Sequence, residues 1–263
     1  MTLIAISILV YTVSSVLHEG LGHGLVRVLL GGKVSVIAST VCVATGPDLG
    51  LAADRIVAAG GTLVNLLAAG LCCVLLSRKG AWSSWFQYFL WLSFAVNGFL
   101  GAGYLAVLTF IGFGDWMVVL RGLHPHWFWR TGMILLGVIL YAAVAYFAMR
   151  TLEPLLGCNK QVRSKRALWL TLLPYFTGGL AFCAAGLFNP VGARLVLISA
   201  AASSFGGASG LAWLSSWSLG RGPDATTPEQ PANLPKSMLW ILIGSASGAF
   251  LILFLGRGIS FDP

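Results

Sequence analysis

Charged side chains are scarce in this sequence, and acidic ones most of all. They make up 9% of the 263 residues, with 16 lysines and arginines against 8 aspartates and glutamates, whereas about 25% is usual in a soluble domain. So few charges cannot cover the surface of a soluble fold of this size. Because 57% of the residues are hydrophobic, lipid must surround much of the exterior.

Three further signals are absent. No face combines basic with aromatic residues, so the net charge of +8 predicts no nucleic-acid partner; the basic residues lie between apolar runs, where anionic lipid headgroups attract them. The five cysteines form no CxxC pair and predict no disulfide framework or redox compartment. The start of the chain lacks the basic segment of a signal peptide, so we expect its first apolar run to be retained.

Apolar runs dominate what is present, and each is about as long as the roughly 20 residues that span a bilayer. They predict an all-α polytopic membrane protein with about seven transmembrane helices (six to eight), in a bacterial-type inner or plasma membrane. Only Phe188, Asn189 and Pro190 separate the fifth run from the sixth, which predicts a tight hairpin or one broken element. The runs cover residues 3–30, 56–76, 85–111, 131–149, 167–187, 191–214 and 238–255.

Two segments between these runs differ from them. Residues 32–54 alternate polar and branched apolar side chains and then turn at Gly46-Pro47-Asp48, which predicts a short β-like hairpin or re-entrant segment at the membrane. Residues 220–235 contain four prolines and predict a flexible loop. We therefore expect a core in residues 1–120, with three transmembrane helices and the β-like segment. Residues 121–263 add helices to which the sequence assigns no role.

The segment with the clearest chemistry lies inside the first run. His18, Glu19 and His23 are ionisable residues in an apolar helix, where they are costly to desolvate and indicate function. Imidazoles can ligate zinc, and a neighbouring carboxylate can act as a general base. The alternative is a neutral polar network between helices.

The spacing of the two histidines departs from the familiar zinc helix. His18 and His23 are five residues apart in an H-E-x-x-x-H pattern, whereas H-E-x-x-H places its histidines four apart on one face. On a regular α-helix an offset of five corresponds to roughly 140°. A π-bulge would restore a common face, and Gly20, Gly22 and Gly24 make such a distortion easier.

Two other segments fall near the same membrane face. Gly61 and Asn65 lie at the start of the second run, where the amide could bind an extended backbone or simply pack helices. Asp115 follows the third run and could complete a zinc site with an open position, or be an ordinary interfacial residue. Since the first three runs alternate in direction, all these residues come to similar depth near one face.

These segments resemble the site-2 protease family of intramembrane zinc metalloproteases. His18-Glu19…His23 is similar to the family's H-E-x-x-H with one residue inserted, and Gly61…Asn65 matches its Gly-x-x-x-Asn. Asp115 stands for the family's aspartate, although Trp116 replaces the glycine that usually follows. The similarity covers roughly the first 120 residues.

The resemblance implies a role for each residue. His18, His23 and Asp115 would bind Zn²⁺, and Glu19 would activate the zinc-bound water. Gly61 and Asn65 would hold the substrate, a transmembrane protein or peptide, which is cleaved in or near its transmembrane segment.

Two other classes of protein stay open. Breaks at Pro174, Asn189-Pro190 and Gly206-Gly207 would suit a transporter or ion channel, with His18, Glu19 and Asp115 relaying protons or binding a cation. A non-catalytic membrane protein could keep a degenerate zinc site. His124 and His126 could supply a ligand if His23 points away, but they also suit an interfacial loop. The sequence does not indicate membrane orientation or oligomeric state.

Overall fold

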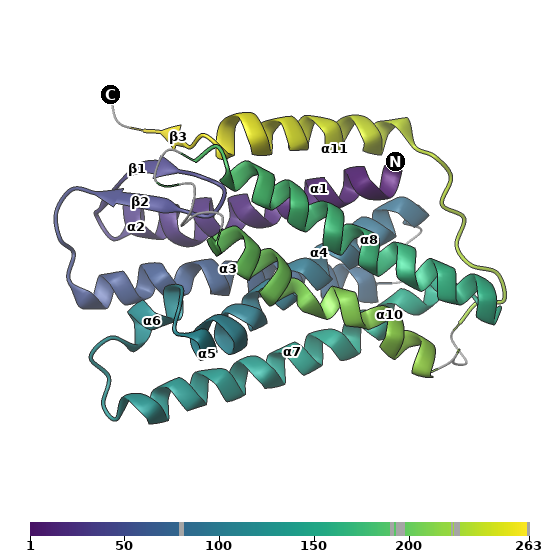
Figure 1. The fold of residues 1–263 in the computed structure, drawn as a ribbon, viewed down its shortest axis with the longest axis horizontal. Coiled ribbons are helices and arrows are strands. Elements are labelled where there is room, and N and C mark those ends of the chain that lie inside the picture. Colours follow the sequence, from purple (N-terminus) through teal and green to yellow (C-terminus); the bar gives the residue numbers. More distant parts are fainter. Residues whose placement is uncertain (79–81, 190–191, 193–197, 222, 224–226, 262–263) are drawn as a thin grey trace.

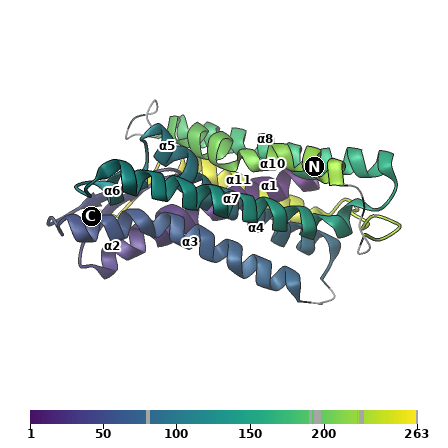
Figure 2. The same ribbon diagram turned by 90° about the horizontal axis from the view of Figure 1, so that it is seen from below.

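The computed structural model describes residues 1–78, 82–189, 192, 198–221, 223 and 227–261. Long helices lie side by side in a bundle, with a small sheet at one end (Figures 1 and 2). Six helices among the described residues are long and apolar enough to cross a bilayer. The chain is therefore an all-α polytopic membrane protein with a short β segment, as its sequence predicts.

Several of the long helices are composite, because π-helical turns interrupt them. The first comprises α1, a π segment and α2, and the third comprises α4, a π segment and α5. The bounds are α1 Thr2–Ser15, π Val16–Leu25, α2 Val26–Leu29, α3 Leu51–Ser77, α4 Ser84–Gly103, π Tyr104–Leu108, α5 Thr109–Ile111, α6 Asp115–Leu120, α7 His126–Leu156, α8 Lys160–Gly186, π Ala202–Gly206, 3-10 Gly207–Ser209, α10 Gly210–Arg221, α11 Met238–Phe250 and π Leu251–Leu255.

The centre of the bundle is formed by α4, which packs against α1, α3 and α7. Small residues allow these close approaches; a Cβ at Gly98, for example, would lie 2.9 Å from Val144. By contrast, α7 and α11 are mostly exposed, and their outward residues are large and apolar. Lipid is the solvent that suits such surfaces.

A three-stranded sheet marks one end of the bundle, the sheet end. It contains β1 Lys33–Ile37, β2 Cys42–Thr45 and β3 Ile259–Ser260 in the antiparallel order β2-β1-β3. The predicted hairpin is present, but β1 and β2 reverse at residues 38–41, where the Ala38 N–H donates to Val41 O over 2.8 Å. The predicted turn Gly46-Pro47-Asp48 instead follows β2 and leads into α3.

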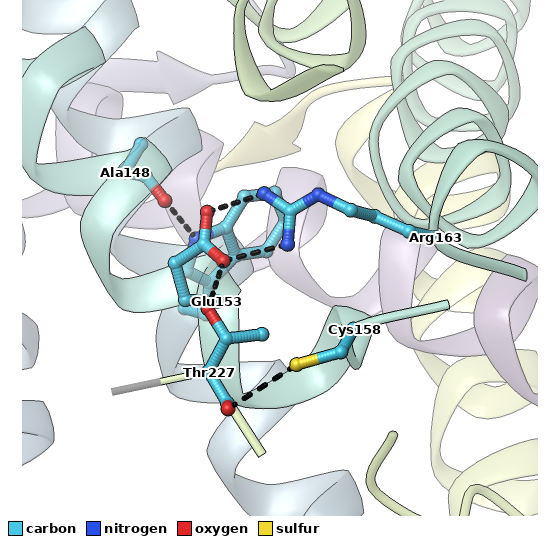
Figure 3. A network of polar contacts seen from close by, with 6 residues as sticks. Ala148, Glu153, Cys158, Arg163 and Thr227 are labelled. Atoms are coloured by element: carbon cyan, nitrogen blue, oxygen red, sulfur yellow. Dashed lines mark hydrogen bonds and ion pairs between the residues drawn. The ribbon is translucent and has the colours of Figure 1, made fainter. Parts of the chain in front are cut away.

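The opposite end is crossed by residues 227–237, the strap (Figure 1). The loop expected in this region is held by donors from the helix ends: Trp85 Nε1 donates to Pro235 O and Arg166 to Ala232 O, each over 2.6 Å. Figure 3 shows the buried centre of these contacts, in which Arg163 forms two hydrogen bonds with Glu153 (2.6 and 2.7 Å) and Thr227 donates to Glu153 (2.9 Å). The strap is thus tied to the ends of α4, α7 and α8.

A further helical segment, residues 198–221, lies between α8 and the strap in the chain. The C-terminal part of α8 lies at the sheet end. Ser199 lies at the same end, because it lines a cavity beside β2. Since Thr227 is at the strap end, residues 198–221 cross the bundle as a helix with π and 3-10 turns. The six helices that are long and apolar enough to span a bilayer fall within the expected range of six to eight, and the sixth predicted run, residues 191–214, lies partly outside the described residues. α8 continues through Pro174 without the break considered above.

Candidate metal centre

The two histidines of the first helix lie on a π-helical segment, Val16–Leu25. Because its hydrogen bonds run from residue i to i+5, side chains five positions apart return to one face. The imidazole rings of His18 and His23 accordingly meet edge to face, with centroids 4.8 Å apart. The local distortion considered from the sequence is the one that this helix adopts.

Asp115 reaches the histidines from a separate helix. The third helix ends at Ile111, and Gly112 and Gly114 reverse the chain in backbone conformations with φ of 76° and 85°, which glycine adopts readily. Asp115 therefore begins α6 rather than closing the third span. Trp116 anchors this short helix, since its Nε1 donates to Thr62 Oγ1 on α3 over 3.0 Å.

Three ligand atoms converge at this point. Asp115 Oδ2 lies 3.3 Å from His18 Nε2 and 3.5 Å from His23 Nε2. The other ring nitrogen of His23, Nδ1, lies 2.8 Å from Val57 O, which fixes the ring and leaves Nε2 to face the carboxylate. Asp115 Oδ2 is buried and makes no hydrogen bond. This trio, whose ligand atoms all lie within 4.8 Å of one another, could hold a metal ion.

Gly61 makes room for these atoms. Gly22 on the π segment packs directly on Gly60 and Gly61 of α3, so the two helices touch backbone to backbone. A Cβ at Gly61 would lie 2.6 Å from His18 Nε2 and 2.8 Å from His23 Nε2. The glycine of the predicted substrate-binding pair therefore adjoins the candidate ligand atoms of both histidines.

Glu19 lies between two cavities at the centre. The outer cavity, of about 400 Å³, is lined by His18, Glu19, His23 and Asp115 and by residues of β2. The inner cavity, of about 20 Å³, is lined by Glu19, His18 and Asn65. Glu19 itself is buried. Glu19 therefore borders both spaces.

Asn65 lies one helical turn beyond Gly61 and contributes to the inner cavity. Its Oδ1 is buried without a hydrogen-bond partner, so an acceptor remains available beside Glu19. Phe182, Ser203 and Ser204 line the same cavity. Residues 121–263, to which the sequence assigned no role, thus form part of the wall of the centre.

The charges of the centre favour an ionised Asp115. Burial alone would raise the pKa of its carboxyl, but the adjacent imidazoles of His18 and His23 hold that pKa well below its usual value. Burial, together with the nearby Glu19 carboxylate, raises the pKa of the Cys42 thiol in β2 to about 12. The aspartate is therefore a ready metal ligand at neutral pH, while the thiol stays protonated.

The structure brings together His18, Glu19, His23, Gly61 and Asp115, with Asn65 one turn away. His124 and His126 are not part of this group. They were expected to supply a ligand only if His23 pointed away, and His23 faces Asp115. Two neighbouring aromatic residues, Trp116 and Tyr104, carry no sequence signal. The ring of Tyr104 is tilted by 36° against that of His18, with the centroids 4.7 Å apart. Only their positions in the fold reveal them.

Comparisons with known proteins give no match: neither a family model, nor a curated protein, nor a solved structure is similar to this chain.

Proposed function

We propose that this protein is an intramembrane zinc metalloprotease of the site-2 protease type. The observation that carries the proposal is the convergence of two imidazoles from the π segment and one carboxylate from α6 beside a buried glutamate. Ligand atoms about 2.0–2.2 Å from one tetrahedral zinc ion lie about 3.3–3.6 Å apart. The two distances from Asp115 Oδ2 to the imidazoles, 3.3 and 3.5 Å, match this spacing.

The donor set also fits a catalytic rather than a purely structural zinc site. Two histidines and one carboxylate provide three protein ligands and leave one position open, as hydrolytic zinc sites do. Bound zinc would supply a Lewis acid that polarises the scissile carbonyl and makes water a stronger nucleophile. The buried Asp115 Oδ2 without a hydrogen bond is a further sign that these residues fit a cation.

The protein's own residues supply the proton transfers and the substrate contacts. Glu19 would take a proton from the attacking water and later give it to the leaving amine. Asn65 Oδ1 would accept a hydrogen bond from the N–H of an extended substrate backbone. Gly61, which has no side chain beside the imidazoles, would let the substrate backbone approach closely. The partner would be a transmembrane protein or peptide that enters from the lipid bilayer.

Metal analysis of the purified protein tests the zinc site. We expect about one zinc per chain in the wild type and none in His18→Ala, His23→Ala or Asp115→Ala. His124→Ala and His126→Ala serve as matched controls, since these histidines lie outside the centre, and should keep the metal. A wild-type protein that stays free of zinc after incubation with it contradicts the proposal.

The Glu19→Gln variant separates catalysis from metal binding. We expect it to keep its zinc while cleavage of single-span test proteins in liposomes falls by about 10²- to 10⁴-fold, the usual contribution of a general base. Zinc binding with no cleavage by either form would favour a non-catalytic protein or a transporter. The proposal includes a bacterial-type inner or plasma membrane as its location, which fractionation of expressing cells would test.

A further inference from the structure

The outer face of α8 carries an apolar groove. The groove has a volume of about 380 Å³ and is lined by Leu168, Trp169, Leu172, Leu173 and Phe176. α8 lies along one edge of the bundle (Figure 2), and Leu168, Trp169 and Phe176 are 43%, 58% and 47% exposed. Because side chains this exposed have no helix packed over them among the described residues, the groove is open to the lipid around the protein.

Lys165 lies at the strap end of this groove. Residues three or four positions apart are neighbours on one face of an α-helix, so Lys165 adjoins Leu168 and Trp169. Leu172 and Phe176 continue the same face, each within about 20° of Lys165 when viewed down the helix axis. The face therefore changes from basic to apolar along α8, as a phospholipid does from its headgroup to its acyl chains.

The neighbouring arginines of α8 are already bound within the protein. Arg163 forms two hydrogen bonds with Glu153, and Arg166 donates to Ala232 O in the strap. Lys165, by contrast, is exposed and makes no hydrogen bond or ion pair among the residues that the structure describes. Its ammonium is therefore available to a negatively charged group outside the protein.

The length of this face matches one leaflet of a bilayer. Phe176 follows Lys165 by eleven positions, which corresponds to about 16 Å along the helix axis. This distance is close to half of the roughly 30 Å hydrocarbon core. Trp169, which lies between them, is of a residue type enriched at the membrane interface. Lys165 therefore lies at the level of the headgroups, and the groove lies below it in the hydrocarbon region.

The charges of the strap end favour an anionic lipid. Among the described residues at this end, Arg78, Lys160, Lys165 and Lys236 are exposed basic side chains, whereas Glu229 is the only exposed acidic one. Such an excess of positive charge attracts anionic headgroups. A zwitterionic headgroup carries an ammonium of its own, which the ammonium of Lys165 would repel.

We propose that this face of α8 is a binding site for one anionic phospholipid of the leaflet at the strap end. The phosphate lies against the ammonium of Lys165, and one acyl chain lies in the groove beside Trp169, Leu172 and Phe176. The site is at the opposite end of the bundle from the candidate metal centre and needs neither zinc nor proteolysis, so either proposal can fail without the other.

Native mass spectrometry of the detergent-purified full chain tests the headgroup contact. Phosphatidylglycerol should bind at one molecule per chain and more tightly than phosphatidylcholine with the same acyl chains. Lys165→Gln should raise the dissociation constant for phosphatidylglycerol about 5-fold, the usual contribution of one lysine at an anionic surface. Lys33→Gln is the matched control, because it makes the same charge change at an exposed position of the sheet end, and should leave this constant unchanged. Equal affinity for the two lipids, or equal effects of the two substitutions, overturns the site.

Filling the groove tests the acyl-chain contact. Leu172→Trp puts a larger side chain into the groove and should weaken binding of phosphatidylglycerol several-fold, because the chain loses its packing surface. Leu180→Trp is the matched control on the same helix, since Leu180 is 59% exposed and does not line the groove. Leu168→Trp replaces Leu172→Trp if the latter fails to fold. Unchanged affinity in the folded groove variant overturns the site, because the lipid would then be held by its charge alone.

Discussion

The Cα of Gly61 faces the Nε2 atoms of both His18 and His23. The space in front of these nitrogens exists because α3 carries no side chain there. Asp115 enters the same space from a different direction. At the scale of single residues, the centre therefore depends on one absent Cβ as much as on the three ligands.

Alanine at position 61 should abolish zinc binding. Its Cβ would lie less than 3 Å from both Nε2 atoms, so the imidazoles would have to move away from Asp115. Gly70→Ala is the matched control on the same helix, because a Cβ there meets nothing within 4 Å. Metal content measured by mass spectrometry should separate the two; zinc retained equally in both would contradict this account of Gly61.

The hydrogen bond between Trp116 and Thr62 should position Asp115. Replacing Thr62 with valine keeps the shape but removes the acceptor for the indole N–H, so α6 loses its polar anchor on α3. We expect a loss of about 0.5–1.5 kcal/mol in the free energy of unfolding and weaker zinc binding. Chelator competition and thermal unfolding measure the two effects; Trp82→Phe at an exposed tryptophan should alter neither.

The sequence predicts the members of the centre whose chemistry is rare in a membrane helix. His18, Glu19 and His23 are conspicuous because ionisable groups are costly in lipid, and Asp115 because acidic residues are scarce. Tyr104 and Trp116 were not predicted, since an aromatic residue in an apolar run is ordinary. Their importance depends on which helix lies opposite, which residue type alone does not encode.

At the scale of elements, the π-helical segment determines whether the histidines share a face. On a regular α-helix His18 and His23 would diverge by roughly 140°. Within Val16–Leu25 the wider turn brings them together, and Gly22 lets this wider helix lie directly on α3. The sequence allowed such a distortion, but the backbone contact that accompanies it depends on a partner helix.

Gly22 and Gly20 should respond oppositely to alanine. A Cβ at Gly22 would overlap the backbone of Gly60 and Gly61, so Gly22→Ala should lower the free energy of unfolding by about 1–3 kcal/mol and weaken zinc binding. Gly20 has only Val16 nearby, at 3.9 Å, so Gly20→Ala should be neutral or stabilise by up to about 1 kcal/mol. Thermal unfolding in detergent compares them, and equal effects would contradict the contact.

At the scale of the whole molecule, the sheet end and the strap end contain different buried polar groups. One end carries the candidate metal centre, and the other carries the buried Glu153–Arg163 pair that ties the strap to α7 and α8 (Figures 1 and 3). The six candidate membrane spans among the described residues were predictable from apolar runs alone. The strap's contacts were not, because a proline-rich segment gives no sign of the donors that meet it.

Removing one partner of this pair should destabilise the fold and spare the metal. Glu153→Gln removes the carboxylate that accepts two hydrogen bonds from the buried Arg163, and breaking a buried ion pair usually costs about 3–5 kcal/mol. Zinc per folded chain should stay at the wild-type value, because the pair lies at the far end of the bundle. Thr227→Val, which removes a single hydrogen bond to Glu153, should cost less. Loss of zinc from folded Glu153→Gln protein would contradict this independence.

The pairing of β3 with β1 has a consequence for biosynthesis. Ile259 and Ser260 pair with Ile37 and Val36, so the third strand of the sheet lies more than 200 residues after its neighbour in the chain. The candidate spans that precede α11 can enter the bilayer while the hairpin beside the centre still lacks one strand. A ribosome must complete residue 260 before the sheet can close. Because of this order of synthesis, the sheet beside the centre is completed only when nearly the whole bundle is in the membrane.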